Sequence, residues 1–509
     1  MKKKAVVAAG HEAVTGAAAL ILEAGGNAFD AVVAAGFAGT VAEQMLTSLG
    51  GGGFALARTA DQQEIFFDFF VDTPGLGLET SQLEPHFYPI KVEFGGSDQE
   101  FNIGLGSVAV PGTLKGLLHI HERLGRMPLS EVIEPAVILA EGHRINAFQA
   151  EFIRLLRPIL TMTAPGRTLY EPDGALLRAG ATLEVPELAA FLRQLAEDKG
   201  KEFYCGEIAH LIDQEMRNGD GLLTAEDLGA YRVIERKPLR VPYHGHTLLT
   251  APDLGGSLVG LSLFLQEKIG EVAGSLEQWG SPEYLLRTLG LMQEVERLRK
   301  QGVDSPQTLA DFIAGRDSEA SVGRMRRFSR GTTHISVADS RGNIASMTCS
   351  NGEGSGYFVP GTGIMLNNMM GEDDLHPDGF HAEPPGQRVR SMMSPSALLY
   401  ENEVKLVFGS GGSKRIRTAL SQVLTQYVDF KRDLVEAVQA PRLHWDDDGG
   451  VLQIEPGIDA QAIAAVQKQV PINLWDDRNV YFGGVHAVMP GVGGVGDPRR
   501  GGSVAVVEL

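Results

Sequence analysis

Residues 331–351 read GTTHISVADSRGNIASMTCSN, a stretch with two extended segments around a turn. Polar and apolar residues roughly alternate over residues 333–337, and an extended pattern resumes after the turn-forming residues 339–343. The whole stretch therefore predicts a β-hairpin, and two adjacent threonines, Thr332 and Thr333, open its first strand. Because threonine is a good strand former, a structural role is the default interpretation until the rest of the chain is considered.

The chain has 509 residues, more than one ordinary hydrophobic core accommodates, so we expect several domains or one large layered domain. Apolar residues make up 43% and charged residues 21%, proportions typical of a soluble globular protein. The formal net charge of −19 argues against nucleic acid or an anionic membrane surface as a partner.

Two cysteines, Cys205 and Cys349, lie far apart in the chain and cannot form a disulfide framework, which fits a reducing compartment. The apolar run near the N-terminus ends at Gly10, short of the roughly 7 to 15 residues of a secretory signal core. Nothing elsewhere approaches about 18 apolar residues in a row, so we expect no transmembrane helix. These features predict a cytoplasmic protein.

Helical spacing covers residues 13–23 and 28–43, with a turn at residues 25–27 that permits left-handed backbone. Four consecutive glycines follow at residues 50–53, where neither a helix nor a strand explains them. They indicate either a flexible turn or backbone that packs against a site where a side chain would not fit.

The composition changes near residue 305. Residues 305–331 are polar and basic and are the best candidate for a linker, although a basic run is more often a solvated surface. Before it, residues 1–331 mix helices with some strands. After it, residues 332–509 read as strands with one clear helix, at residues 415–430.

Several short motifs occur in the order known from one enzyme family. The chain resembles the gamma-glutamyltransferase (gamma-glutamyltranspeptidase) family nearly end to end. Each motif is weak by itself, whereas the ordered set is a strong signal. The matching stretches are EAGGNAFDA (23–31), LGGGGF (49–54), PGT (111–113), LLTAEDL (222–228), TTH (332–334), LNN (366–368), MSP (393–395), GGS (411–413) and GDPR (496–499).

The resemblance implies an α+β protein with the N-terminal nucleophile hydrolase fold, a four-layered αββα sandwich. It also implies one precursor that cuts itself between Gly331 and Thr332. A large fragment, 1–331, and a small fragment, 332–509, would then stay associated as one αββα unit. A threonine hydroxyl needs an adjacent base, and cleavage would supply the α-amine of Thr332, whose reference pKa of about 8 suits this role.

The resemblance also assigns supporting catalytic residues. The oxyanion formed on acyl attack needs donors fixed in advance, and a glycine-rich turn before a helix at Arg415 can aim backbone N–H groups at it. In the family this role belongs to the glycine pair that corresponds to Gly411 and Gly412; a phosphate-type loop or a plain turn is the alternative. Ser350 stands where the family usually has a second threonine that hydrogen-bonds the nucleophile and assists processing. Thr333 is a further supporting donor.

The chain departs from the family where the substrate would bind. Family members hold the substrate α-carboxylate with an arginine, and Phe70 occupies that position. A phenyl ring cannot form the charge-assisted pair that a carboxylate requires. The acidic residue that binds the substrate α-amine falls at Glu372, or at Asp373 or Asp374 if the loop shifts.

The remaining substrate-binding residues are partly retained. Of the two adjacent serines expected before the MSP motif, Ser391 is present, and Met392 replaces the other. Asn351 completes the expected set. Arg388 or Arg390 could take over the carboxylate, although loop arginines are more commonly exposed.

Three functions stay open. The first is an N-terminal threonine amidohydrolase or acyltransferase whose acyl group is not an ordinary γ-glutamyl group with a free α-carboxylate. The second is a conventional gamma-glutamyl hydrolase or transpeptidase with relocated carboxylate binding. The third is an uncleaved homologue that acts as a binding protein. We expect a small amide or gamma-glutamyl-like substrate, a possible homo-oligomer, no cofactor and no metal, because the acidic loops at residues 372–374 and 446–448 lack recognisable ligand spacing.

Overall fold

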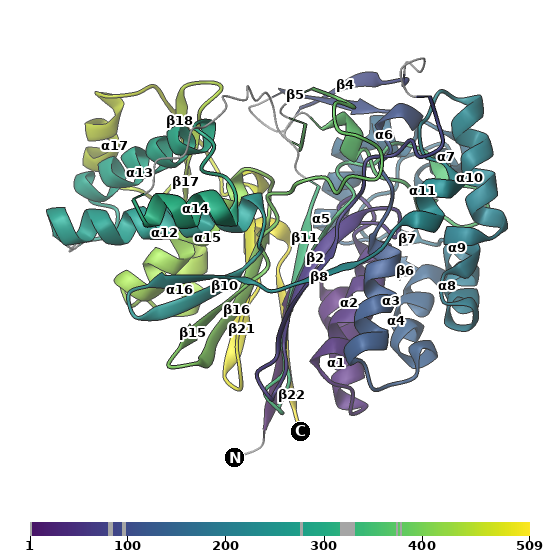
Figure 1. Ribbon diagram of the computed structural model, residues 1–509, viewed down its shortest axis with the longest axis horizontal. Helices are drawn as coiled ribbons and strands as arrows, with labels where there is room; N and C mark the ends of the chain where they lie inside the picture. The colour runs from purple at the N-terminus through teal and green to yellow at the C-terminus, as the bar shows by residue number, and fades with distance from the viewer. Residues whose placement is uncertain are drawn as a thin grey trace.

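The computed structural model describes residues 3–79, 85–93, 98–274, 278–315, 331–372, 375–376 and 379–509. Its elements form four layers, two central sheets with helices on either side, which Figure 1 shows edge-on. The α+β class and the αββα sandwich expected for the N-terminal nucleophile hydrolase fold are therefore confirmed.

The first sheet has seven strands in the order β22-β1-β11-β12-β2-β3-β8, and neighbouring strands run antiparallel. It is covered on both faces, which explains why strands such as β1, KAVVAA, are apolar almost throughout. Its strands are β1 (Lys4–Ala9), β2 (Gly52–Arg58), β3 (Glu64–Phe69), β8 (Ile234–Arg236), β11 (Thr333–Ala338), β12 (Ile344–Ser350) and β22 (Ser503–Glu508).

The second sheet has six antiparallel strands in the order β21-β20-β16-β15-β10-β9. It packs face to face on the first sheet, and apolar side chains of both sheets share one core. Its strands are β9 (Leu239–Tyr243), β10 (His246–Thr250), β15 (Ser396–Tyr400), β16 (Glu403–Gly411), β20 (Gly484–Met489) and β21 (Gly493–Val495).

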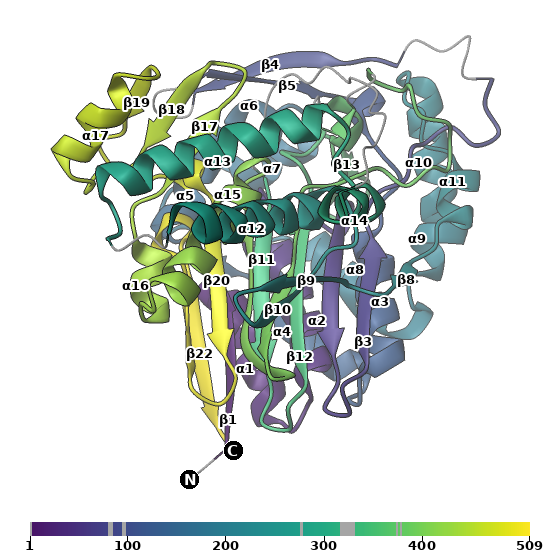
Figure 2. The ribbon, with the colours of Figure 1, turned by 60° about the vertical axis from the view of Figure 1, so that its left-hand side comes forward.

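Helices from the first half of the chain cover the outer face of the first sheet, and later helices cover the second (Figures 1 and 2). The first group is α1 (Glu12–Glu23), α2 (Ala28–Ala42), α3 (Thr113–Leu124), α4 (Leu129–Glu141), α5 (Ala147–Leu155), α6 (Arg157–Leu160), α7 (Ala164–Tyr170), α8 (Pro186–Asp198), α9 (Lys201–Cys205), α10 (Glu207–Asn218) and α11 (Ala225–Ala230). The second group is α12 (Leu254–Ala273), α13 (Pro282–Lys300), α14 (Pro306–Ile313), α15 (Arg415–Leu424), α16 (Leu434–Gln439) and α17 (Ala460–Gln467).

Short strands complete the structure at the periphery. They are β4 (Tyr88–Glu93) with β5 (Asp98–Ile103), β6 (His143–Arg144) with β7 (Thr182–Leu183), β13 (Phe358–Val359) with β14 (Ile364–Met365), and the set β17 (Leu443–Asp446), β18 (Val451–Ile454) and β19 (Ile472–Leu474).

The predicted hairpin is present as β11 and β12, which pair with Thr333 opposite Cys349. Side chains alternate between its two faces. Ile335 packs into the core beneath the first helical layer, whereas Ala338 packs into the core between the sheets. The alternation places Cys349 on the face opposite Ser350, and Cys349 is buried.

The glycine run allows close approach of backbones rather than flexibility. A Cβ atom on Gly51 would lie 2.3 Å from the carbonyl oxygen of Ser350, and one on Gly53 would lie 2.8 Å from that of Thr348. The run therefore lets β2 pack against β12 without side chains between them.

Two expectations need correction. Residues 306–313 form α14, whose N-terminus is capped by Ser305, so the expected linker does not begin at residue 305. The remainder of that linker, residues 316–330, lies outside the described residues. The helix at Arg415 ends at Leu424 and continues as one π-helical turn, and α16 and α17 add helices that the sequence pattern missed.

Candidate active site

A cavity lies where the ends of β3, β11 and β12 in the first sheet meet the loop that follows β16 in the second. Several residues predicted from the sequence line it together: Phe70, Thr332, Ser350, Glu372, Ser391 and Met392. The other described lining residues are Met369, Leu375, Met393, Ser413 and Ile416. Segments from both halves of the chain therefore build one site.

The hydroxyl of Ser350 connects Thr332 with the carbonyl group that precedes it. Thr332 Oγ1 donates to Ser350 Oγ at 3.4 Å, and Ser350 Oγ donates to the carbonyl oxygen of Gly331. The backbone N–H of Gly352 donates to the same serine oxygen at 3.1 Å. Ser350 thus polarises the carbonyl of the peptide bond before Thr332, because a donated proton favours negative charge on that oxygen.

Gly331 is held in place from both sides. Its N–H donates to Glu353 Oε1 at 3.0 Å. A Cβ atom at this position would lie 1.6 Å from the carbonyl oxygen of Gly352, so only glycine fits here. These contacts fix the carbonyl of Gly331 beside the hydroxyls of Thr332 and Ser350.

Thr333 does not line the cavity. Its hydroxyl donates to Glu43 Oε2 at 3.0 Å, on the side of the helical layer. Glu43 caps the C-terminus of α2 and is buried. Burial raises the pKa of Glu43 to about 7, although the hydrogen bond from Thr333 and the charge of Arg500 act in the opposite direction. Thr333 therefore ties β11 to the helical layer beneath it.

The glycine pair at the end of β16, Gly411 in the strand and Gly412 directly after it, lies behind Thr332. A Cβ atom on Gly411 would lie 2.3 Å from the carbonyl oxygen of Thr332. Gly412 has a φ of 121°, which side-chain-bearing residues rarely adopt. The next residue, Ser413, lines the cavity, and α15 begins at Arg415 as expected. The assignment of Gly411 and Gly412 as oxyanion donors stays a prediction.

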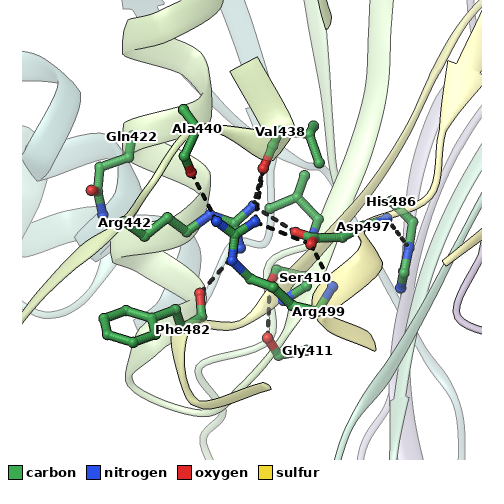
Figure 3. A network of polar contacts seen from close by, with 12 residues as sticks. Ser410, Gly411, Gln422, Val438, Ala440, Arg442, Phe482, His486, Asp497 and Arg499 are labelled. Carbon is green, nitrogen blue, oxygen red and sulfur yellow. Dashed lines mark hydrogen bonds and ion pairs between the residues drawn. The ribbon is translucent and has the colours of Figure 1, made fainter. Parts of the chain in front are cut away.

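A buried network of charges supports this loop from behind (Figure 3). Arg442 Nη2 donates to Asp497 Oδ2 at 2.6 Å, and Arg499 Nη1 donates to Asp497 Oδ1 at 3.2 Å. Burial alone would raise the pKa of Asp497, but the two arginines outweigh it and lower that pKa. The adjacent Arg500 donates from Nη1 to the carbonyl oxygen of Thr332 at 2.9 Å.

The wall around Phe70 is apolar. Phe70 directly follows β3, and its ring lies 5.7 Å from the ring of Phe54. Its carbonyl oxygen accepts a hydrogen bond of 2.6 Å from the hydroxyl of Tyr231. Met369 and Ile416 come from distant segments to line the same cavity. Among the described residues, this part of the cavity therefore presents apolar side chains and no cationic one.

The two alternative arginines are engaged elsewhere. Arg388 donates to Asp68 Oδ1 at 2.5 Å and to Asp72 Oδ1 at 2.5 Å, so carboxylates of the protein already neutralise it. Arg390 donates to Asp304 Oδ2 at 2.9 Å and is partly exposed. Neither arginine lines the cavity.

The other predicted substrate-binding residues differ in their placement. Glu372 and Ser391 line the cavity. Asn351 is fully buried beside Gly51 and lies outside the cavity lining. Asp373 and Asp374 lie outside the described residues.

Sequence reasoning missed Glu43, Arg500 and most of the apolar wall. A signal was present for two of these residues, since Arg500 directly follows the GDPR motif and Met369 directly follows the LNN motif. Leu375 and Ile416 carried none, because an isolated apolar residue is far more often part of an ordinary core.

The acidic clusters considered as metal sites have other contacts or are incomplete. Asp447 and Asp448 pair with Lys300 and Lys414. Within the part of the chain that the structure describes, no three or more His, Cys, Asp and Glu side chains gather in a way that could bind a metal ion. No helix of that part is long and apolar enough to span a membrane.

Comparisons with known proteins agree with this architecture. Residues 15–507 match the gamma-glutamyltranspeptidase family profile. Acylase ACY 1 proenzyme of Pseudomonas sp. (strain SE83) is 31% identical over 487 residues, covering 91% of this chain and 86% of the relative. Glutathione hydrolase proenzyme of Escherichia coli (strain K12) is 29% identical over 507 residues, covering 91% and 85%.

A solved structure shows the same fold. Cephalosporin acylase from Bacillus halodurans superposes with a TM-score of 0.83 at 26% sequence identity, and the match covers 99% of this chain and 96% of that one. The relatives are enzymes, and two of them carry the word proenzyme in their names. The chain belongs to the gamma-glutamyltranspeptidase family.

Proposed function

We propose that this protein is a self-processing amidohydrolase or acyltransferase that breaks its own Gly331–Thr332 bond and then uses Thr332 as the nucleophile on a small amide. The observation that carries the proposal is the chain of hydroxyl contacts from Thr332 through Ser350 to the Gly331 carbonyl, in the wall of a cavity. The names of the proenzyme relatives support it.

Self-cleavage uses the contacts of the uncleaved chain. Thr332 Oγ1 attacks the carbonyl carbon of Gly331 and passes its proton to Ser350, while Ser350 donates its own proton to the carbonyl oxygen. The carbon–nitrogen bond then breaks as the hydroxyl of the tetrahedral intermediate gives up its proton and the nitrogen of Thr332 gains one, and an ester joins Gly331 to the threonine oxygen. Water hydrolyses this ester and leaves a carboxylate on Gly331 and a free hydroxyl and amine on Thr332.

Turnover repeats the acyl chemistry on a substrate. The α-amine of Thr332 accepts the proton of its own hydroxyl as Oγ1 attacks the substrate carbonyl. That proton goes to the leaving amine, and an acyl-enzyme ester remains on Thr332. Water or an acceptor amine then takes the acyl group and regenerates the hydroxyl. We expect the backbone of the loop at Gly411 and Gly412 to stabilise the oxyanion.

The cavity favours an apolar acyl group. Phe70 stands beside side chains such as Met369 and Ile416, and Arg388 is already neutralised by two aspartates. A free carboxylate on the acyl group would enter this wall without a cationic partner, which is costly. Glu372 and Ser391 provide a polar end that suits an amine or hydroxyl group. A relative named acylase supports this substrate class.

Two measurements test the proposal. Denaturing electrophoresis of freshly purified protein should show two fragments, and Thr332→Ala should stay one intact chain. Thr332→Ser, which keeps a hydroxyl, is the matched control and should still be cleaved. A wild-type chain that stays intact would favour the uncleaved binding protein, and cleavage of Thr332→Ala at this bond would remove Thr332 from the mechanism.

For the substrate, we expect kcat/KM for butyryl-p-nitroanilide to exceed that for γ-glutamyl-p-nitroanilide. Phe70→Arg should shift this preference toward the γ-glutamyl substrate by roughly tenfold to a hundredfold, the range for a hydrogen bond to a charged group. Efficient turnover of γ-glutamyl-p-nitroanilide by the wild-type protein would instead support the conventional gamma-glutamyl enzyme.

A further inference from the structure

A second cavity is lined by residues of α3, α4, α8 and α9 and of the turns between them, in the helical layer that covers the first sheet. Its volume is about 610 Å³, within the roughly 300–1,000 Å³ of typical small-molecule sites. Of the described residues, none lines both this cavity and the one at Thr332. We call it the basic cavity because of the side chains that line it.

Four cationic side chains from three segments converge on the basic cavity: Lys115 of α3, Arg126 of the loop after it, and Lys199 and Lys201 at the junction of α8 and α9. Among the described residues, none of the four forms an ion pair. Only one carboxylate, that of Glu122, belongs to the lining that the structure describes. Such a cluster is unexpected on a chain with a net charge of −19, because unpaired like charges repel one another.

The two histidines of the lining are already engaged. His119 Nε2 contacts Glu235 Oε1 at 2.9 Å, and His121 Nε2 lies 2.8 Å from the carbonyl oxygen of Met127. The unsatisfied positive charge of the basic cavity therefore comes from the lysines and the arginine.

The inner wall of the basic cavity is aromatic and apolar. Lys115 Nζ lies 4.5 Å from the ring centre of Tyr204, and the side chains of Leu118 and Met127 complete this wall. Burial, and then the nearby cation of Arg232, lowers the pKa of Lys115. An anion at this point would oppose both effects, because a nearby negative charge favours the protonated amine. Helix α4 begins at the rim without a side-chain cap, so its first N–H groups also favour negative charge.

We propose that the basic cavity binds a small organic anion, with an anionic head against Lys115, Lys199 and Lys201 and an aromatic or apolar body against Tyr204. The charge cluster selects the head, and the ring and aliphatic side chains select the body. The proposal does not depend on the chemistry at Thr332, since the two cavities are separate.

Tyr204 connects the basic cavity with the candidate active site through a short series of residue contacts. The Tyr204 ring stacks on Tyr231 with ring centres 6.2 Å apart, and the Tyr231 hydroxyl donates to the carbonyl oxygen of Phe70. Phe70 lines the cavity at Thr332. Two contacts, from Tyr204 to Tyr231 and from Tyr231 to Phe70, therefore connect the basic cavity with the apolar wall of the cavity at Thr332.

Phenyl phosphate is a suitable probe because it joins a dianionic head to an aromatic ring. Isothermal titration calorimetry on the full chain should show saturable binding of phenyl phosphate that is tighter than that of inorganic phosphate or phenol. The double variant Lys199→Gln with Lys201→Gln should weaken this binding by about tenfold, because it removes two of the three charges that hold the anionic head and each exposed ion pair contributes only modestly. Both residues are exposed, so the fold should tolerate the change.

The control removes the same charge elsewhere. Arg178→Gln with Lys468→Gln affects two exposed residues outside the basic cavity and should leave the affinity for phenyl phosphate unchanged. Equal weakening by both double variants would show a general charge effect and overturn the site. Absence of saturable binding at millimolar phenyl phosphate would overturn it as well, and so would inorganic phosphate binding as tightly as phenyl phosphate.

Discussion

At the scale of single residues, Ser350 connects the proposed nucleophile, the Thr332 hydroxyl, with the carbonyl group of Gly331 that it would attack. Its oxygen accepts hydrogen bonds from the Thr332 hydroxyl and from the Gly352 N–H, and its own hydroxyl donates to the Gly331 carbonyl. Serine in place of threonine keeps the hydroxyl that these contacts require. The substitution therefore keeps the chemical group on which the predicted role of this position depends.

Replacing Ser350 by alanine should slow self-cleavage by roughly a hundredfold to a thousandfold, the usual cost of one donor to a developing oxyanion. Ser350→Thr should stay near the wild-type rate. The loss of intact chain over time on denaturing gels measures both rates. Ser421→Ala, a buried serine in α15 away from the cavity, is the control. Unchanged cleavage in Ser350→Ala would contradict the proposed proton path.

At the scale of elements, the end of α2 and the start of β11 are joined by a carboxyl group in the interior. Glu43 accepts from Thr333, and burial raises its pKa to about 7 from an ordinary value of 4.5. The folded state thus binds this proton more tightly than the unfolded state does. The contribution of Glu43 to stability is full below about pH 4.5 and declines as the pH rises to about 7.

Glu43→Gln removes this titration. Relative to the wild type, the free energy of unfolding of the variant should increase by an amount on the order of 3 kcal/mol as the pH rises from 4.5 to 7. A difference in stability that does not depend on pH leaves this comparison unchanged. Urea unfolding at several pH values measures the difference. Glu187→Gln, an exposed residue of α8, serves as the comparison. Parallel pH curves for the wild type and Glu43→Gln would contradict the argument.

At the scale of the whole molecule, the two regions on either side of the proposed cleavage site share both sheets. In the first sheet, β11 and β12 of region 332–509 lie between β1 and β2 of region 1–331. In the second sheet, β15 of the later region pairs with β10 of the earlier one. The interdigitated strands and their common core favour one folded unit over two separate domains.

We therefore expect cleavage to leave both fragments associated. Cleaved protein should elute as one species in size-exclusion chromatography, and that peak should give two bands on a denaturing gel. Separation should require denaturant, because it would break backbone pairing in both sheets and expose their shared core. The uncleaved Thr332→Ala variant marks the elution volume of the intact unit. Separate elution of the fragments without denaturant would contradict this expectation.

The hairpin and the order of the motifs are the features that the sequence alone predicted correctly. Residues 344–350 form β12 over the predicted range, and the ordered motifs identify the family that the comparisons confirm. By contrast, α14 lies within the stretch that the composition predicts as a linker. The sequence pattern does not reveal this helix, because a short helix held by its cap and by packing has a weak periodic signal.

The sequence by itself determined the fold class and the family, because these follow from ordered motifs along the chain. The same motifs carry the prediction that Thr332 is the nucleophile. Only the tertiary structure decided that Phe70 joins Ile416 and Met369 in one apolar wall, and that Asp68 and Asp72 occupy Arg388. Those contacts join residues hundreds of positions apart. No local pattern encodes them, since they arise when two sheets close on each other and bring the ends of their strands together.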